Sequence, residues 1–199
     1  SMSAAYDLPE GREIGRVVGD APGPTLIVVA GIHGNEHAGL SAVRRALATL
    51  TRRQGRVMGE LVAFAGNLGA MRLGIRYRER DMNRVWTNER IADLEARARS
   101  GEALDAEDHE QLELLAAIRA AIARARGPVY LIDLHTTSAH GLPFILFGDT
   151  LKQRKFASVI PLPLLMGLEE ALDGVLTAYF TQQGCATFAV EGGQHDDPG

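Results

Sequence analysis

The sequence predicts an α/β fold, a three-layer α/β/α arrangement around a mixed, largely parallel central sheet. Short apolar runs rich in β-branched residues, typical of buried strands, recur along the chain. Between them lie longer segments whose apolar residues recur at helical spacing. Strands that alternate with helices favour parallel pairing through crossover connections. Two of the apolar runs, 25–30 and 128–134, are followed closely by metal-binding residue types, at the sheet edge where α/β proteins place their ligands.

The expected elements follow from this pattern in chain order. The first strand, 13–18, is followed by a turn-forming segment rich in glycine and proline, 19–24. Asp105, followed three residues later by Asp108, is typical of a helix N-cap. The segment 68–87 has many arginines and little periodicity, which predicts a long functional loop. The expected strands are 13–18, 25–30, 59–65, 128–134, 144–147 and 185–190, and the expected helices are 38–50, 88–98, 106–125 and 172–182.

The composition is that of a globular protein with one core. The 199 residues, 46% hydrophobic and 23% charged, predict a single domain over 1–199. A formal charge of −4 argues against a nucleic-acid partner, and the apolar runs are too short to span a membrane. One cysteine and no signal-peptide pattern favour the cytoplasm, while nothing indicates an oligomeric state. A helix-start signal at 196–198 with no helix after it predicts that the chain stops inside a larger protein or has lost a C-terminal region.

Three candidate metal ligands stand at strand ends. His33 and Glu36 lie three residues apart in the glycine-rich loop after strand 25–30, and His135 follows strand 128–134. Two histidines with one carboxylate form a common ligand set for a catalytic zinc ion, which keeps one position open for water. The residues themselves therefore predict a mononuclear zinc hydrolase.

Two neighbouring residues bear on this ligand set. Asp133, two residues before His135 on the same face of a strand, is placed to hydrogen-bond that imidazole. An alternative set uses His33 and His37 as ligands with Glu36 as the base, in a His-x-x-Glu-His pattern. That pattern needs a continuous helix, and the glycines around it favour a turn. We therefore interpret Glu36 as a ligand and His37 as the start of the next helix.

Four motifs follow one another along the chain. They are His33-Gly34-Asn35-Glu36, then Arg76-Tyr77 with Asp81-Met82-Asn83-Arg84, then Asp133-Leu134-His135-Thr136-Thr137, then Val190-Glu191-Gly192-Gly193. In this order they resemble the motifs of the aspartoacylase and succinylglutamate desuccinylase family, whose members are relatives of the zinc carboxypeptidases. The resemblance spans about residues 25–195 and implies a zinc carboxypeptidase-like fold.

The resemblance implies catalytic roles for the matching residues. His33, Glu36 and His135 match the family's ligands for one zinc ion per chain. Arg76 matches the arginine that polarises the scissile carbonyl and stabilises its oxyanion. Glu191 matches the general base that takes a proton from the attacking water and passes it to the leaving amine.

The resemblance also implies a site for the carboxylate of the substrate. Asn83 and Arg84 match the family's carboxylate-binding pair, because a guanidinium group fits a carboxylate with two parallel hydrogen bonds. We assign Asn67, at the end of strand 59–65, to the same substrate site. Asp81 is expected to brace the arginines.

The chain departs from the family pattern in two places. Aspartoacylase-type members carry a further arginine before the catalytic glutamate, and the segment 178–183 has none. The family's C-terminal β-rich region, which narrows the mouth of the site, is expected to be absent or truncated. The predicted function is a zinc-dependent deacylase that cleaves the amide of an N-acyl amino acid or similar small carboxylate. The alternatives are a zinc carboxypeptidase acting on peptides or peptidoglycan fragments, and a non-catalytic zinc-binding domain.

Overall fold

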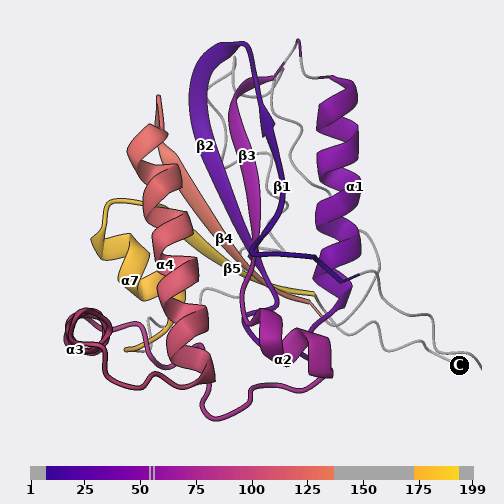
Figure 1. Cartoon of the computed structure of the whole chain (residues 1–199). Helices are drawn as coiled ribbons and strands as arrows, with labels where there is room; N and C mark the ends of the chain where they lie inside the picture. Colours follow the sequence, from indigo (N-terminus) through magenta and orange to yellow (C-terminus); the bar gives the residue numbers. More distant parts are fainter. Residues whose placement is uncertain (1–7, 54, 56, 137–172, 193–199) are drawn as a thin grey trace, which may run out of the picture.

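A five-stranded mixed sheet forms the centre of the molecule in the computed structural model, which describes residues 8–53, 55, 57–136 and 173–192 (Figure 1). The strand order is β1-β3-β2-β4-β5. β1 runs antiparallel to β3, and the other three pairings are parallel. The predicted mixed, largely parallel sheet is confirmed. The strands are β1 (Glu13–Val18), β2 (Ala21–Ala30), β3 (Met58–Ala65), β4 (Val129–Thr136) and β5 (Ala186–Gly192).

Helices cover both faces of this sheet, so the three predicted layers are present (Figure 1). Along β2 the side chains alternate between the two faces, as a strand buried on both sides requires. Leu26 and Val28 pack in one core cluster with the helix α1 (Ala38–Arg52), whereas Ile27 and Val29 pack in the other cluster with the helix α4 (Ala106–Arg124). One face carries α1 (Ala38–Arg52) and α2 (Leu68–Leu73); the other carries α3 (Asn88–Ser100), α4 (Ala106–Arg124) and α7 (Leu176–Gln182).

The beginning of β2 differs from the prediction. The segment 19–24 was expected to be a turn, but β2 starts at Ala21, which pairs with Met58. The register then shifts before Thr25, so the glycine- and proline-rich stretch forms an irregularity within the strand. Gly59 makes this close pairing feasible, because its φ of 88° is left-handed and a Cβ there would lie 1.9 Å from a backbone oxygen.

The arginine-rich segment 68–87 also differs, because it opens with the short helix α2. Asn67 caps this helix by accepting a hydrogen bond from the Ala70 N–H, and Gly74 ends it in the left-handed conformation. α7 begins at Leu176, four residues later than the sequence predicted. The expected strand 144–147 lies outside the described residues.

The N-cap predicted for α4 is confirmed. Asp105 accepts from the N–H of Asp108, whose carboxylate accepts from the N–H of Asp105 in return. Asp108 also pairs with Arg90 and Arg97 and so ties α3 to α4. In the described part of the chain, no helix is both long and apolar enough to cross a membrane.

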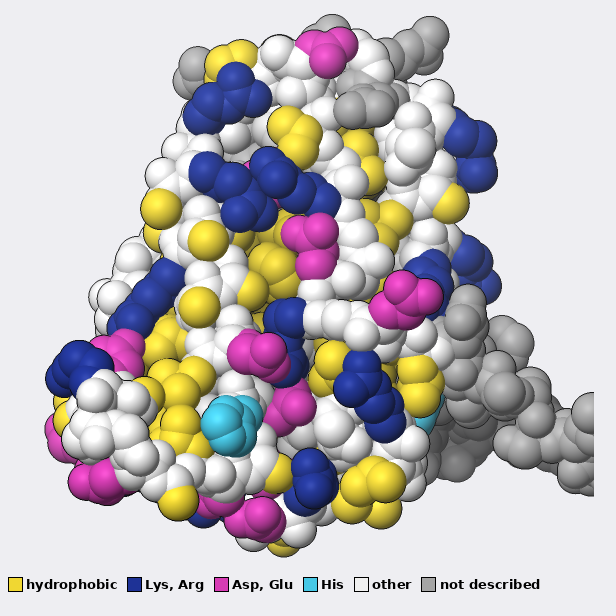
Figure 2. Space-filling view, viewed as in Figure 1, with side chains coloured by type: hydrophobic (Ala, Val, Ile, Leu, Met, Phe, Trp, Pro, Cys, Tyr) yellow, Lys and Arg dark blue, Asp and Glu magenta, His cyan; other side chains and the backbone are white. Residues whose placement is uncertain are grey.

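A group of arginines lies at the end of the molecule where α4 finishes and β2 begins, seen near the top of Figure 2. Arg16 and Arg124 both pair with the buried carboxylate of Glu60, at 2.6 and 2.7 Å. These residues line a shallow hollow at the amino-terminal edge of the parallel strands. The candidate ligands His33 and His135 stand at the opposite edge, so this basic group belongs to a different part of the surface.

Candidate metal centre

The loop after β2 brings two of the candidate ligands side by side. Gly31, with a φ of 78°, turns the chain out of the strand, and the N–H of Glu36 then bonds to the carbonyl of His33 at 3.1 Å. Gly34 lies against α2 so tightly that a Cβ would come within 2.4 Å of the backbone of Ala70. The helix α1 starts only at Ala38. The loop is therefore a turn, as predicted, and not the helix that the alternative His-x-x-Glu-His pattern requires.

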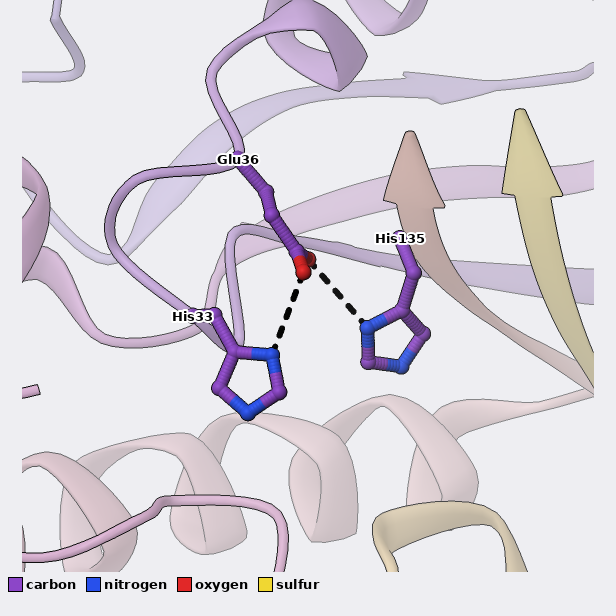
Figure 3. Close-up of side chains that lie close together, drawn as sticks. All are labelled: His33, Glu36 and His135. Carbon is purple, nitrogen blue, oxygen red and sulfur yellow. Dashed lines mark hydrogen bonds and ion pairs between the residues drawn. The ribbon is translucent and has the colours of Figure 1, made fainter. Parts of the chain in front are cut away.

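The third candidate ligand, His135, lies on the neighbouring strand β4. Ala30 of β2 pairs with Leu134 of β4, so His135 stands beside the point where the ligand loop leaves the sheet. Glu36 lies between the two imidazoles (Figure 3). Its Oε1 is 3.2 Å from Nδ1 of His33, and its Oε2 is 3.2 Å from Nδ1 of His135. One ligand atom from each residue lies within 4.8 Å of the others. The structure thus brings together three residues that are far apart in the sequence.

A carboxylate lies behind each imidazole and fixes its orientation. Nε2 of His33 bonds to Asp81 at 2.8 Å, and Nε2 of His135 bonds to Asp133 at 2.7 Å. Both Nδ1 atoms are thereby directed at Glu36. The bond from His135 to Asp133 was predicted. Sequence reasoning missed the bond from His33 to Asp81, because no periodic pattern links positions 48 residues apart.

The electrostatics of the cluster favour a bound cation. Burial would raise the pKa of Glu36, but the hydrogen bonds and charges of His135 and His33 outweigh it and lower that pKa to about 2. Burial would likewise lower the pKa of His135, but the carboxylates of Asp133 and Glu36 raise it to about 11. Burial acts to raise the pKa of Asp81, yet its hydrogen bonds and nearby cations lower it. Each Nδ1 therefore faces an ionised carboxylate, an arrangement that needs a proton or a metal ion between the two atoms.

The donor set fits zinc. Two imidazole nitrogens and one carboxylate oxygen are typical of zinc sites that keep an open position. Zn–N and Zn–O distances of about 2.1 Å in a tetrahedron separate neighbouring donors by about 3.4 Å. Each Nδ1 lies 3.2 Å from one oxygen of Glu36, Oε1 for His33 and Oε2 for His135, so each imidazole has a carboxylate oxygen close to this spacing. Carboxylates that orient ligand histidines, as Asp81 and Asp133 do, are a usual feature of zinc sites.

A model of the succinylglutamate desuccinylase/aspartoacylase catalytic domain matches residues 22–197. The chain belongs to this family. The resemblance found in the sequence is therefore confirmed. Among curated relatives, this family member is 32% identical over 175 residues to the succinylglutamate desuccinylase of Chromobacterium violaceum, covering 84% of this chain and 50% of that protein. It is 30% identical over 171 residues to that of Burkholderia pseudomallei, covering 83% and 47%.

Solved structures of the family have the same fold. The structure of the succinylglutamate desuccinylase from Chromobacterium violaceum superposes with a TM-score of 0.60 at 26% identity, covering 91% of this chain and 58% of that one. The enzyme from Vibrio cholerae gives 0.59 at 15% identity, covering 90% and 53%, which shows the fold alone. The chain spans about half the length of the curated relatives it matches.

Both arginines given a role by the family resemblance, Arg76 for the oxyanion and Arg84 for the substrate carboxylate, are exposed. Arg76 accepts a hydrogen bond at its carbonyl from the N–H of Gly34. Asp81 was expected to brace the arginines, and its carboxylate lies 3.4 Å from the guanidinium of Arg76. Arg84 is held through a hydrogen bond to the carbonyl of Asn83, at 2.8 Å. The backbone of Glu191 pairs in register with His135 across β5 and β4, which places this residue on the strand beside a ligand.

Two asparagines of the predicted substrate site make hydrogen bonds to other parts of the protein. Asn67 is fully buried: its oxygen caps α2 at Ala70, and its NH₂ donates to Glu107 at 3.2 Å. In place of the expected substrate contact, Asn67 thus has a structural role, because both ends of its amide are used. The oxygen of Asn83 accepts from the N–H of Leu176 at 2.9 Å, which joins the arginine-rich segment to α7.

Proposed function

We propose that this family member is a zinc-dependent amidohydrolase that removes the acyl group from an N-acyl amino acid or a similar small carboxylate. The observation that carries the proposal is the convergence of His33, Glu36 and His135, with a carboxylate behind each imidazole. The family supports the reaction class, and the curated relatives are named as succinylglutamate desuccinylases. N-Succinylglutamate is therefore the first substrate to test.

The proposed zinc ion, one per chain, would be held by His33, Glu36 and His135. When bound, zinc supplies Lewis-acid chemistry, because it acidifies a coordinated water and polarises a carbonyl. Asp81 and Asp133 keep the two imidazoles oriented for this role.

The other proposed roles belong to Glu191, Arg76 and Arg84. Glu191 takes the proton from the attacking water and returns it to the leaving amine. Arg76, beside the ligand loop, stabilises the negative charge that develops on the carbonyl oxygen. Arg84, with its exposed guanidinium group, binds the carboxylate of the substrate and so places the amide in register.

The test compares Glu191→Gln with the wild-type chain. The glutamine variant is expected to bind one zinc per chain with wild-type affinity and to lose turnover by about 100-fold or more, since a general base contributes about 10² to 10⁴. Glu102→Gln, an exposed glutamate outside the site, is the matched control and should keep full activity. Chelation should abolish turnover, and added zinc should restore it.

A substrate panel decides the class of substrate. It contains N-succinylglutamate, N-acetylaspartate and short peptides with a free C-terminus. Turnover of peptides alone would identify a carboxypeptidase, and stoichiometric zinc without turnover of any substrate would identify a zinc-binding domain. Near-wild-type turnover by Glu191→Gln would refute the assigned base.

A further inference from the structure

The segment 75–84, which follows α2, forms one wall of the candidate metal centre. Gly34 of the ligand loop packs directly on its backbone, and the N–H of Gly34 donates to the carbonyl of Arg76 at 3.0 Å. Further along, Asp81 bonds to His33 at 2.8 Å. The position of this segment therefore sets where Arg76 and Asp81 stand relative to the ligands.

Glu107 of α4 holds this segment through hydrogen bonds to its backbone. Its carboxylate is buried, with 1% of the residue exposed. Oε1 accepts from the N–H of Arg78 at 2.5 Å and from the NH₂ of Asn67 at 3.2 Å, and Oε2 accepts from the N–H of Glu79 at 3.0 Å. Glu107 lies in the first turn of α4, where the helix dipole favours a negative charge. The buried carboxylate is thus compensated by three donors and a helix end.

The two backbone amides bound by Glu107 lie between Arg76 and Asp81 in the chain. Fixing residues 78 and 79 restricts the backbone on either side, so it restricts both functional side chains together. We propose that Glu107 is a positioning residue of the metal centre, which acts on the site through the segment 76–81. The effect of Glu107 on His33, through Asp81, is argued from the observed hydrogen bonds. Its effect on catalysis, through Arg76, rests on the proposed function.

A purely structural role for Glu107 is the competing explanation, and α4 provides a matched control for it. Glu110, one turn later, also accepts from two backbone amides, those of Leu68 at 2.8 Å and Gly69 at 3.1 Å. These amides belong to the start of α2 and not to the segment that carries Arg76. Loss of Glu110 should therefore loosen the start of α2 and leave the hydrogen bonds of Glu107 to residues 78 and 79 in place.

The test compares Glu107→Gln with Glu110→Gln in the whole chain. Whichever way the new amide of Glu107→Gln is turned, its NH₂ faces an N–H donor, so at least one bond to the segment is lost. The first readout is zinc affinity, measured by competition with a chromophoric chelator. Through Asp81, Glu107→Gln should weaken zinc binding by about 10-fold, as expected when a carboxylate behind a ligand histidine is disturbed. Glu110→Gln should bind zinc as the wild type does.

The second readout is amide hydrogen exchange in the zinc-free protein. Exchange should speed up at residues 78–81 in Glu107→Gln, and at residues 68–69 in Glu110→Gln. If N-succinylglutamate is a substrate, Glu107→Gln should also lower kcat by about 10- to 100-fold at saturating zinc, because an oxyanion donor is displaced. The value of KM should change little.

The outcomes separate the two proposals. Equal losses of zinc affinity in both variants, or a Glu107→Gln variant with wild-type zinc affinity, would overturn the positioning role. A wild-type chain that hydrolyses none of the substrates refutes the proposed function, yet zinc affinity and hydrogen exchange still test Glu107. If Glu107→Gln does not fold, Glu107→Asp keeps the charge, withdraws the carboxylate by one methylene and carries the same expectation.

Discussion

Removal of the carboxylate of Asp133 should weaken zinc binding while the protein stays folded. Asp133 is 1% exposed, and its Oδ2 lies 2.7 Å from Nε2 of His135. That bond directs Nδ1 of His135 at Glu36 and keeps Nε2 from acting as the ligand atom. In Asp133→Ala the ring loses this constraint, and a buried N–H loses its acceptor.

The size of the effect follows from the type of bond. A hydrogen bond to a charged group contributes about 1.5–3 kcal/mol, which corresponds to about 10- to 150-fold in affinity. Mutation of a carboxylate that bonds to a ligand histidine usually lowers metal affinity by about 10- to 100-fold, which agrees with this range. Asp133→Asn retains an acceptor for His135, and its NH₂ can occupy the place of Oδ1, which bonds to none of the described residues. A neutral bond is about half as strong as a charged one, so this variant should lose only about 4- to 12-fold.

The assay is a competition titration of zinc against a chelating dye, with circular dichroism of each variant to confirm that it is folded. Asp93→Ala is the control, because it removes the same charge from an exposed carboxylate on α3. The predicted order of affinities is wild type and Asp93→Ala, then Asp133→Asn, then Asp133→Ala. A folded Asp133→Ala protein that binds zinc as tightly as the wild type would refute the reasoning, since His135 would then not depend on Asp133.

Three further predictions concern the scaffold. Asn67→Ala removes the cap of α2 and should lower the free energy of unfolding by about 2 kcal/mol in urea titrations; an unchanged midpoint would contradict the capping role. Gly59→Ala should lower the free energy of unfolding by about 2 kcal/mol or more, because φ is 88° and the new Cβ meets the Pro24 oxygen. Gly11→Ala, where nothing lies within 4 Å of the new Cβ, should change it little, and equal effects of the two substitutions would contradict this. Burial raises the pKa of the Cys185 thiol, so its reaction with a disulfide reagent at pH 8 should be slower than that of a free thiol and should accelerate as the pH rises; rapid labelling of the folded chain at pH 8 would contradict this.

The sheet and the three candidate ligands could be predicted because their signals are local. An apolar run such as 25–30 is long enough to identify a buried strand, and the residue types that follow it identify a ligand loop. His135 was found in the same way, from the strand that precedes it. Parallel strands then bring their carboxyl ends to one edge whatever their separation in sequence.

The support from Asp133 could be predicted from its place in the strand, but the supports from Asn67 and Glu107 could not, because their signals are tertiary. The helix α2 has six residues, too few for a periodic pattern, and its cap at Asn67 looked like part of a substrate site. Glu107 lies in a charged helix where a glutamate is usually solvated, yet α4 packs so that its carboxylate is buried against the backbone of residues 78 and 79. Only the packing of α4 against the segment 67–84 distinguishes this glutamate from its neighbours.

The division between predictable and unpredictable residues has a physical cause in the register of the sheet. Ala30 is paired with Ala65 on one side and with Leu134 on the other, so three parallel strands reach the same edge at the same level. The fourth continues this line, because Glu191 pairs with His135. Residue types placed just after these positions must therefore lie near one another, and a metal centre can be inferred from strand ends alone. Distances as short as those between a metal and its ligands need additional support from outside the sheet. Here Asp81 bonds to His33, and Glu107 of α4 bonds to the backbone of residues 78 and 79 just before it.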